Sequence, residues 1–290
     1  MKIAIVGAGY AGVAVAWHLL RQNMEVTLFD GGEGASHNST GLLHSAPGKG
    51  ALPTWRAEEG IAAAVKLLNA ASIERPVYVK NGILRIAVND EQRALFGGET
   101  LWVADGITVY SRLYLAGLKK ACGQAHFEKR WIDDLGELDA FDAIVLTVGS
   151  GISHFLDWPL KKTVGQCLIC RWPEPLAYSL LSQGHITPTE NPEFCLVGST
   201  YEHTERPDPK KALELLDRAA LFYPPAKKFK IVEICSAVRM APKVGYRPIA
   251  ARIGPKIWTL TGLGSRGLIY HALLAKELVD EMADCLAHSV

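Results

Sequence analysis

The first thirty residues alternate between apolar runs and a helical pattern. Residues 2–6 form a short, continuous apolar run, which predicts a buried parallel strand. A glycine-rich loop follows at residues 7–12, apolar residues then recur at helical spacing over residues 13–20, and residues 25–29 predict a second strand. The pattern predicts one βαβ unit at the N-terminal end of the described sequence.

The same alternation returns later in the chain. Residues 114–122 predict a helix, residues 126–130 an extended segment, and residues 143–148 an apolar strand closed by Gly149. Residues 257–261 predict another buried strand, and the apolar positions that follow predict a final helix. This alternation is typical of doubly wound α/β proteins.

The stretch between these parts differs in composition and in its predicted elements. Twelve of the fifteen prolines lie beyond residue 150, and the strand-like runs of this region are residues 162–171, 194–198 and 230–238. Residues 77–88 are also extended, and Asn81-Gly82 predicts the turn of a hairpin. We therefore expect an α/β fold in which a Rossmann-like, cofactor-binding domain receives a second, mixed-sheet substrate domain.

The expected boundaries follow these changes of pattern. The cofactor-binding domain comprises residues 1–72, 99–156 and 242–290, and the substrate domain comprises the hairpin at residues 73–98 and the mixed sheet at residues 157–241.

Composition narrows the class of protein. The 290 residues are 49% hydrophobic and 21% charged, which excludes a disordered, collagen-like or disulfide-scaffold chain. No apolar run approaches membrane-spanning length, and the first residues lack the zones of a signal peptide, so we expect a cytoplasmic protein. The C-x-x-C pair Cys167 and Cys170 lies in a strand-like run without a second ligand pair, so we interpret it as buried core and expect no metal site.

Charge is distributed unevenly along the chain. The whole chain carries a formal net charge of +1, whereas residues 206–256 contain twelve Lys and Arg residues against four Asp and Glu residues, a local net charge of +8. A solvated basic face explains this, and such a face also favours an anionic partner or a nucleic-acid backbone.

The loop Gly7-Ala8-Gly9-Tyr10-Ala11-Gly12 has the G-x-G-x-x-G spacing of a dinucleotide fingerprint. Its glycines allow a tight turn, a close approach of the backbone to a pyrophosphate and the packing of helix on strand. Asp30 ends the second strand eighteen residues after Gly12, where a carboxylate can bind a ribose hydroxyl. A carboxylate there disfavours a ribose phosphate, which leaves FAD or NAD.

A second G-x-G-x-x-G occurs at residues 262–267, between the last predicted strand and the last helix. Only 23 residues follow Gly267, and the helix uses them, so no second strand or ribose-binding acid can follow. We therefore expect this loop to serve the first cofactor, with the helix N-terminus facing the electron-rich pyrimidine edge of a flavin. One dinucleotide bound at both ends of the chain favours FAD over NAD.

These motifs resemble the D-amino-acid-oxidase-like superfamily of FAD enzymes, the glycine oxidase and sarcosine oxidase type, and within it most of all the FAD-dependent domain of the tRNA-modifying MnmC enzymes. Residues 35–43 resemble the family's segment along the pyrophosphate and under the flavin, and residues 142–149 its late FAD strand. Residues 165–166 and 198–202 resemble the start and a turn of its substrate sheet. The resemblance implies cofactor contacts by Gly7, Gly9, Tyr10, Ala11, Gly12, Asp30, Ser36, Asn38, Thr40, Gly41, Leu42, Leu43, Trp131, Gly149, Gly264, Ser265, Arg266, Gly267 and Leu268.

The resemblance also implies catalytic-site residues. It places a carboxylate-binding arginine at Arg239, a second arginine at Arg266, facing the flavin or the substrate, and a substrate contact at Tyr201. His44 follows the flavin-contacting segment and is a further candidate for the pocket. No cysteine adjoins Arg239, where sarcosine oxidases attach their flavin, so we expect noncovalent FAD.

Three functions remain open. The first is FAD-dependent oxidation of a secondary amine that bears a carboxymethyl group, releasing glyoxylate. For this function the resemblance implies carboxymethylaminomethyl-uridine of tRNA as substrate and a separate methyltransferase as a possible partner. The tRNA phosphates would then be contacted by Lys210, Lys211, Lys227, Lys228 and Lys230. The second is a small-molecule oxidase of the glycine, sarcosine or D-amino-acid type. The third is a protein that binds FAD without turnover.

Overall fold

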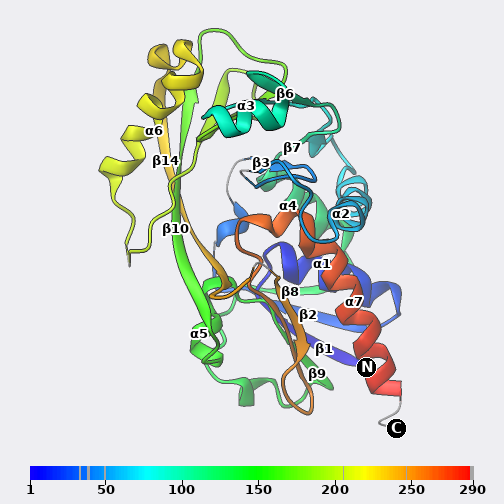
Figure 1. Ribbon diagram of the computed structural model, residues 1–290. Helices are drawn as coiled ribbons and strands as arrows, with labels where there is room; N and C mark the ends of the chain where they lie inside the picture. The colour runs from blue at the N-terminus through cyan, green and yellow to red at the C-terminus, as the bar shows by residue number, and fades with distance from the viewer. Residues whose placement is uncertain (33, 38–39, 49, 205, 246, 288–290) are drawn as a thin grey trace.

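The computed structural model describes residues 1–32, 34–37, 40–48, 50–204, 206–245 and 247–287. These residues form three sheets. In Figure 1 a column built on the long strands β10 and β14 stands on the left, and a helix-covered sheet lies on the right. The mixed α/β fold expected from the sequence is confirmed.

The helix-covered layer is a six-stranded sheet with the order β15-β16-β9-β1-β2-β8. Its strands are β1 (Lys2–Val6), β2 (Glu25–Phe29), β8 (His126–Glu128), β9 (Ala143–Leu146), β15 (Ile249–Arg252) and β16 (Ile257–Thr261). All neighbours pair in parallel except β15, which runs antiparallel to β16. The N-terminal βαβ unit and the late strands predicted from the apolar runs therefore belong to one sheet.

One face of this sheet is covered by four helices. They are α1 (Tyr10–Arg21), α2 (Ala57–Ala71), α4 (Ser111–Ala121) and α7 (Gly267–Ala287). The helix α7 packs across α1 and α2, so the C-terminal helix covers the N-terminal unit (Figure 1). Trp258, Tyr114 and Tyr270 are among the largest fully buried side chains of this core. Burial of these apolar side chains is the main contribution to the stability of this layer, as the apolar pattern of the sequence predicts.

The opposite face is packed by short segments. These are the 3₁₀ turns η2 (Leu135–Leu138) and η3 (Gly149–Gly151) and the helix α5 (Ile152–Phe155). Leu138 and Ile152 are buried there against Ile144 and Leu146 of β9. Because both faces are covered, the central strands β1 and β9 are buried along almost their whole length rather than alternating.

The second layer is a seven-stranded sheet with the order β14-β10-β13-β12-β11-β5-β6. Its strands are β5 (Ile83–Ile86), β6 (Thr100–Val103), β10 (Leu160–Arg171), β11 (Ser179–Leu181), β12 (His185–Pro188), β13 (Phe194–Gly198) and β14 (Lys230–Pro242). The helices α6 (Pro209–Phe222) and η4 (Pro224–Lys228) pack on one face, where Ala212, Leu215 and Ala219 meet Leu168 and Val197. The other face looks toward the six-stranded sheet.

A three-stranded sheet of β3 (Gly41–Leu43), β7 (Ile107–Val109) and β4 (Tyr78–Val79) connects the two layers. The hairpin predicted at residues 77–88 is wrong, because β4 pairs with β7 whereas β5 pairs with β6 and β11. Asn81 does not form a hairpin turn between β4 and β5. Its side chain instead connects two other segments, because its amide donates to the carbonyl oxygen of Ala177 and its Oδ1 accepts from the hydroxyl of Thr108. The short helix α3 (Asp90–Phe96) then leads into β6.

The cysteine pair and the helices bear on two further expectations. Cys167 and Cys170 lie on β10 with buried, unoxidised thiols, as the strand-like pattern predicted. Among the described helices, none is both long enough and apolar enough to cross a bilayer. The domain boundaries given above stay a prediction.

Candidate active site

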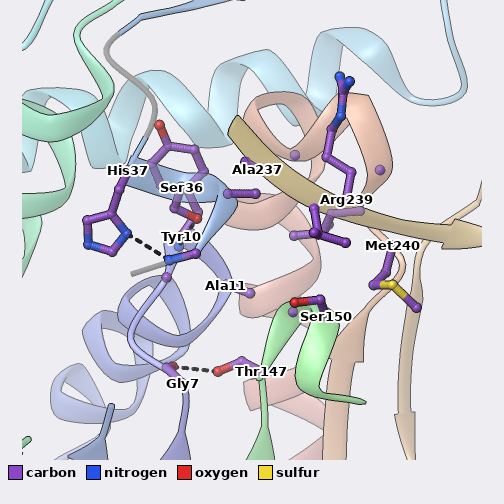
Figure 2. Close-up of a pocket in the computed structure, with 18 of the residues that line it drawn as sticks. Gly7, Tyr10, Ala11, Ser36, His37, Thr147, Ser150, Ala237, Arg239 and Met240 are labelled. Carbon is purple, nitrogen blue, oxygen red and sulfur yellow. Dashed lines mark hydrogen bonds between the residues drawn. The ribbon is translucent and has the colours of Figure 1, made fainter. Parts of the chain in front are cut away.

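A cavity of about 700 Å³ lies between the six-stranded and seven-stranded sheets. Both glycine loops line it: Gly7 and Gly9 from the first, and Gly264 and Gly267 from the second. Figure 2 shows Gly7, Tyr10 and Ala11 on one side of this cavity and Ala237, Arg239 and Met240 along β14 on another. The two motifs, more than 250 residues apart in sequence, therefore share one site.

The first loop turns tightly at the end of β1. Gly7 has a φ of +99°, and a Cβ atom at this position would lie 2.6 Å from the carbonyl oxygen of Thr147. A Cβ atom on Gly12 would lie 1.9 Å from the carbonyl oxygen of Gly7. The Thr147 hydroxyl donates to that same carbonyl over 2.7 Å (Figure 2). The loop closes on itself and on β9, which only glycine permits at these two positions.

The N-terminus of α1 points its free N–H groups toward the cavity. Gly9 is the N-cap residue, without a side chain of its own to accept from the first turn. The Ser36 hydroxyl accepts from the N–H of Tyr10 over 3.1 Å, and Ser36 belongs to the 3₁₀ turn η1 (Ala35–His37), which lies beside the helix start (Figure 2). A helix start with backbone donors and a hydroxyl nearby is suited to a pyrophosphate.

Asp30 and Trp131 line one end of the cavity. Asp30 follows β2, and its carboxylate lies 3.7 Å from Nζ of Lys119. Trp131 packs over Gly31 so closely that a Cβ atom there would lie 2.2 Å from the indole ring. An acidic acceptor beside a flat aromatic surface fits the ribose and adenine of a dinucleotide.

The second loop rests on the end of β14. Gly262 and Gly264 have φ angles of +72° and +55°, and a Cβ atom on Gly264 would lie 3.2 Å from Cβ of Ala241. The 3₁₀ turn η5 (Gly264–Arg266) leads directly into α7. Leu268 of α7 packs over Gly41 of β3, where a Cβ atom would lie 2.6 Å from the leucine side chain. The loop therefore fixes α7 against the segment that the sequence assigns to the flavin.

The residues present fit FAD. The start of α1, Asp30 and the start of α7 all line the cavity, so it offers backbone donors, a carboxylate and a second helix start. The glycines leave the loop backbones bare of side chains at the points of closest approach. FAD would supply an acceptor for a hydride, and Gly9, Ser36 and Asp30 would hold its phosphate and ribose parts.

The substrate side of the cavity is formed by the seven-stranded sheet. Arg239 lies on β14, and its guanidinium covers Gly165 of β10 so closely that a Cβ atom there would lie 2.1 Å from Nη2. The guanidinium donates to the carbonyl oxygen of Thr200 over 3.1 Å and lies 4.5 Å from the centre of the Tyr201 ring. One hydrogen bond and one ring contact hold the arginine and leave donors for a carboxylate.

Of the histidines that line the cavity, His44 and His185 have pKa values well below the ordinary histidine range and are neutral at pH 7. Burial lowers the pKa of His185 to about 4, and the guanidinium groups of Arg239 and Arg218 lower it as well. Burial likewise lowers the pKa of His44 to about 4, with a further contribution from Arg85. Nδ1 of His44 is buried without a hydrogen-bond partner among the described residues. The site therefore presents neutral imidazoles beside permanent guanidinium cations.

Arg85 supports the wall that carries His44. It lies on β5 with a 5% exposed side chain, and it donates to the carbonyl oxygens of Ala46 and Gly48 over 2.7 and 2.9 Å. These bonds fix the loop after β3, while the hydroxyls of Thr40 and Thr187 hydrogen-bond across the two layers. The flavin-side loop is thus tied to the substrate sheet at two points.

Most of the predicted residues converge on this cavity. The following predicted residues line it: Gly7, Gly9, Tyr10, Ala11, Asp30, Ser36, Thr40, Gly41, Leu42, Trp131, Gly149, Tyr201, Arg239, Gly264, Ser265, Gly267 and Leu268. Gly12 packs behind the first loop, and Leu43 is in the core. Arg266 does not line the cavity although both of its neighbours do, and Asn38 lies outside the described residues. The roles assigned to these residues stay predictions.

The sequence reasoning missed three groups that the structure brings to the site. Thr147 locks the first loop, Arg85 holds the loop after β3, and His185 reaches the substrate side. The sequence does contain a signal for His185: Gly198 ends an otherwise apolar strand, and a glycine in a strand indicates a close approach by another group.

Comparison with known proteins agrees with the geometry. Residues 2–100 and 95–281 match the family described as DAO, FAD dependent oxidoreductase. The chain is 24% identical over 321 aligned residues to the tRNA 5-methylaminomethyl-2-thiouridine biosynthesis bifunctional protein MnmC of Maricaulis maris (strain MCS10), covering 97% of this chain and 52% of that protein. The chain therefore spans about half the length of this curated relative.

Solved structures share the fold. Glycine oxidase from Geobacillus kaustophilus superposes with a TM-score of 0.81 at 18% identity, over 99% of this chain and 95% of that chain. Iminodiacetate oxidase from Chelativorans sp. BNC1 superposes with a TM-score of 0.84 at 17% identity, over 97% and 95%. Together with the family match, these findings show that the chain belongs to the DAO family of FAD-dependent oxidoreductases, with FAD as its cofactor.

Proposed function

We propose that this protein oxidises a secondary amine that carries a carboxymethyl group, releasing glyoxylate and the free amine. The observation that carries the proposal is the position of Arg239, whose guanidinium faces the same cavity as the two glycine loops. A guanidinium matches a carboxylate with two parallel hydrogen bonds, which would fix the substrate against the cofactor.

Positioning supplies most of what this reaction needs from the protein. Arg239 would hold the carboxylate, and the cavity walls would bring the C–H bond next to nitrogen toward the cofactor. The amine must be uncharged when the hydride leaves, because its lone pair forms the C=N bond of the imine. Water then hydrolyses this imine to glyoxylate.

For the natural substrate, we infer carboxymethylaminomethyl-uridine of tRNA. Two observations support this finer assignment. The chain matches the MnmC protein over 97% of its length. Lys210 and Lys211 on α6, Lys227 and Lys228 on η4, and Lys230 at the start of β14 are all exposed, so they are available for phosphate contacts. The following methylation would then be carried out by another protein or domain.

A small carboxylated amine is the second candidate. It is favoured by the fold shared with glycine oxidase and iminodiacetate oxidase, each of which covers nearly the whole chain. The residues at the cavity would act in the same way, and only the entrance would differ.

An anaerobic substrate screen tests these assignments. The purified FAD-loaded protein is mixed with glycine, sarcosine, iminodiacetate, or tRNA that bears the modified uridine, and the flavin absorbance is recorded. Bleaching by the modified tRNA, with release of glyoxylate, is the expected result; unmodified tRNA is the control. Bleaching only by small amines selects the second candidate, and no bleaching by any of them contradicts an amine-oxidising role.

A further inference from the structure

Two side chains lie over the neighbouring strands β10 and β13 of the seven-stranded sheet, one over each strand. Arg239 comes from β14, and its Nη2 would lie 2.1 Å from a Cβ atom on Gly165. His185 comes from β12, and its Nε2 would lie 2.8 Å from a Cβ atom on Gly198 of β13. Each side chain reaches the middle of the sheet only because the residue beneath it is glycine. Both line the cavity between the sheets.

The strand register places these two groups at a defined separation. Gly198 pairs with Cys167, which lies two residues from Gly165 on the same face of β10. Cross-strand neighbours are about 5 Å apart and residues two apart along a strand about 6.7 Å, so Gly165 and Gly198, over which the guanidinium and the imidazole lie, are on the order of 8 Å apart. Two hydrogen bonds of about 2.9 Å, joined by an N–Cα–C link with bonds of about 1.5 Å, span such a distance.

The imidazole of His185 has bonding capacity left for a ligand. No described residue hydrogen-bonds its ring nitrogens, while the charged groups that face it are Arg239 from β14 and Arg218 from α6. Among the described residues that line the cavity, Asp30 is the only carboxylate, and it lies at the fingerprint end. A positively charged amine would therefore meet cations and no anion on the substrate side.

We propose that His185 accepts a hydrogen bond from the N–H of the bound amine while Arg239 holds its carboxylate. This inference rests on the proposed function and deepens it: the site selects carboxylated amines with an N–H in uncharged form. The hydrogen bond uses the N–H proton and leaves the nitrogen lone pair free for the C=N bond. His185 is thus a specificity-determining residue, and no proton changes atoms in this contact.

An isosteric ligand pair separates the N–H contact from the carboxylate contact. Iminodiacetate has an N–H between its two carboxymethyl groups, and thiodiacetate has sulfur at the same place. Binding of each ligand to the FAD-loaded protein is measured under anaerobic conditions, from the shift of the flavin spectrum or, where the flavin is reduced, from the concentration dependence of its reduction. The variants are His185→Leu, His185→Gln and Arg239→Gln, with His203→Leu as a control at an exposed histidine.

We expect His185→Leu to weaken the binding of iminodiacetate about tenfold and the binding of thiodiacetate less than about twofold. The difference between the two corresponds to the loss of one hydrogen bond. His185→Gln, which keeps an acceptor at a similar reach, should recover most of the loss, and Arg239→Gln should weaken both ligands. The unchanged flavin spectrum and melting temperature of each variant serve as the folding check.

Two results would overturn the role of His185 and leave the proposed function standing: equal losses for both ligands, or no loss for iminodiacetate. Failure of both ligands to bind the wild-type protein would instead contradict the assignment of this cavity to carboxymethyl amines, and the role of His185 with it. Binding of iminodiacetate without reduction of the flavin would contradict the proposed reaction. The affinities of the two ligands would still test the contact of His185.

Discussion

Arg239 reaches the cavity because Gly165, the residue beneath its guanidinium, has no side chain. Thr200 and Tyr201 then hold the guanidinium from one side. An arginine that is positioned before the substrate arrives loses little side-chain freedom on binding, which strengthens each hydrogen bond to a carboxylate.

Replacement of Arg239 by alanine should therefore weaken carboxylate ligands by about 2 kcal/mol or more, because hydrogen bonds to a charged group are lost. The FAD spectrum should be unchanged, since Arg239 lies on the substrate sheet and not on the glycine loops. Titration of the FAD-loaded variant with iminodiacetate measures the effect, and Arg171→Ala, on the exposed end of β10, is the control. Loss of bound flavin in Arg239→Ala would show that this residue serves the cofactor instead.

His271 makes the stability of the protein depend on pH. Its side chain is fully buried on α7, where Nδ1 donates to the carbonyl oxygen of Gly267 over 2.9 Å and Nε2 accepts from the hydroxyl of Tyr114 over 2.6 Å. Burial lowers its pKa to about 4, whereas an unfolded histidine titrates near 6.5. Between these values the unfolded state binds the proton and the folded state does not.

The contribution of His271 to the free energy of unfolding is therefore fully present above about pH 6.5. It is lost as the pH falls toward 4, and it amounts to on the order of 3 kcal/mol in total. Urea unfolding at pH 7.5 and pH 5 should show a smaller pH effect in His271→Phe than in the wild type. Similarly lowered pKa values occur at His18, His44 and His185, which remain in both proteins. The difference between the two proteins in how far stability changes from pH 7.5 to pH 5 therefore isolates His271. Equal changes in the two proteins would contradict the assignment.

Sequence reasoning at this scale found the glycines and Arg239 but not His185. The reason is physical: a residue's neighbours along a strand are visible in the sequence, whereas its cross-strand neighbours depend on register. His185 meets Gly198 and Cys167 through two pairings that join residues far apart along the chain.

At the scale of elements, the loop between β1 and α1 has almost no room for added atoms. A methyl group on Gly12 would lie 1.9 Å from a backbone oxygen, so neither atom can move aside as a flexible side chain would. Gly12→Ala should cost several kcal/mol of stability or displace α1, and either change would remove the donors that face the pyrophosphate. The variant should purify with little or no flavin.

The flavin-to-protein ratio and the melting temperature of Gly12→Ala measure this effect. Gly98→Ala is the matched control, because a Cβ atom at Gly98 meets no atom within 4 Å. Normal flavin content in Gly12→Ala would mean that the loop is looser than its geometry indicates.

Regular elements with a clear apolar pattern were predictable: β1, β2, β13 and β16 have the predicted bounds. The hairpin at residues 77–88 was not, because Asn81-Gly82 has the composition of a tight turn while tertiary hydrogen bonds to Ala177 and Thr108 decide its partners. Local turn propensity is a weak signal when two sheets compete for the flanking strands.

At the scale of the whole molecule, the exposed lysines of α6 and η4 lie on the outer side of the seven-stranded sheet (Figure 1). If tRNA is the substrate, its affinity should fall as salt rises, because each neutralised phosphate releases counterions. Changing both Lys227 and Lys228 to glutamine should reduce the slope of log affinity against log salt by about 1 to 2.

Filter binding of tRNA between 50 and about 200 mM salt measures that slope, the range over which such contacts change affinity strongly. Lys66→Gln, at an exposed position of α2, is the control. Anaerobic reduction by iminodiacetate should be the same in the double variant as in the wild type. An unchanged slope would place the nucleic-acid contact elsewhere on the molecule.

The shared cavity of the two glycine loops also has a consequence for biosynthesis. The first loop leaves the ribosome more than 250 residues before the loop at residues 262–267, and α7 must then pack over α1 and α2. A nascent chain therefore carries one half of the prosthetic-group site for more than 250 residues of synthesis before the other half is made. Capture of the flavin is coupled to the docking of α7, so a chain cut before residue 262 loses the cofactor even though its dinucleotide fingerprint is intact.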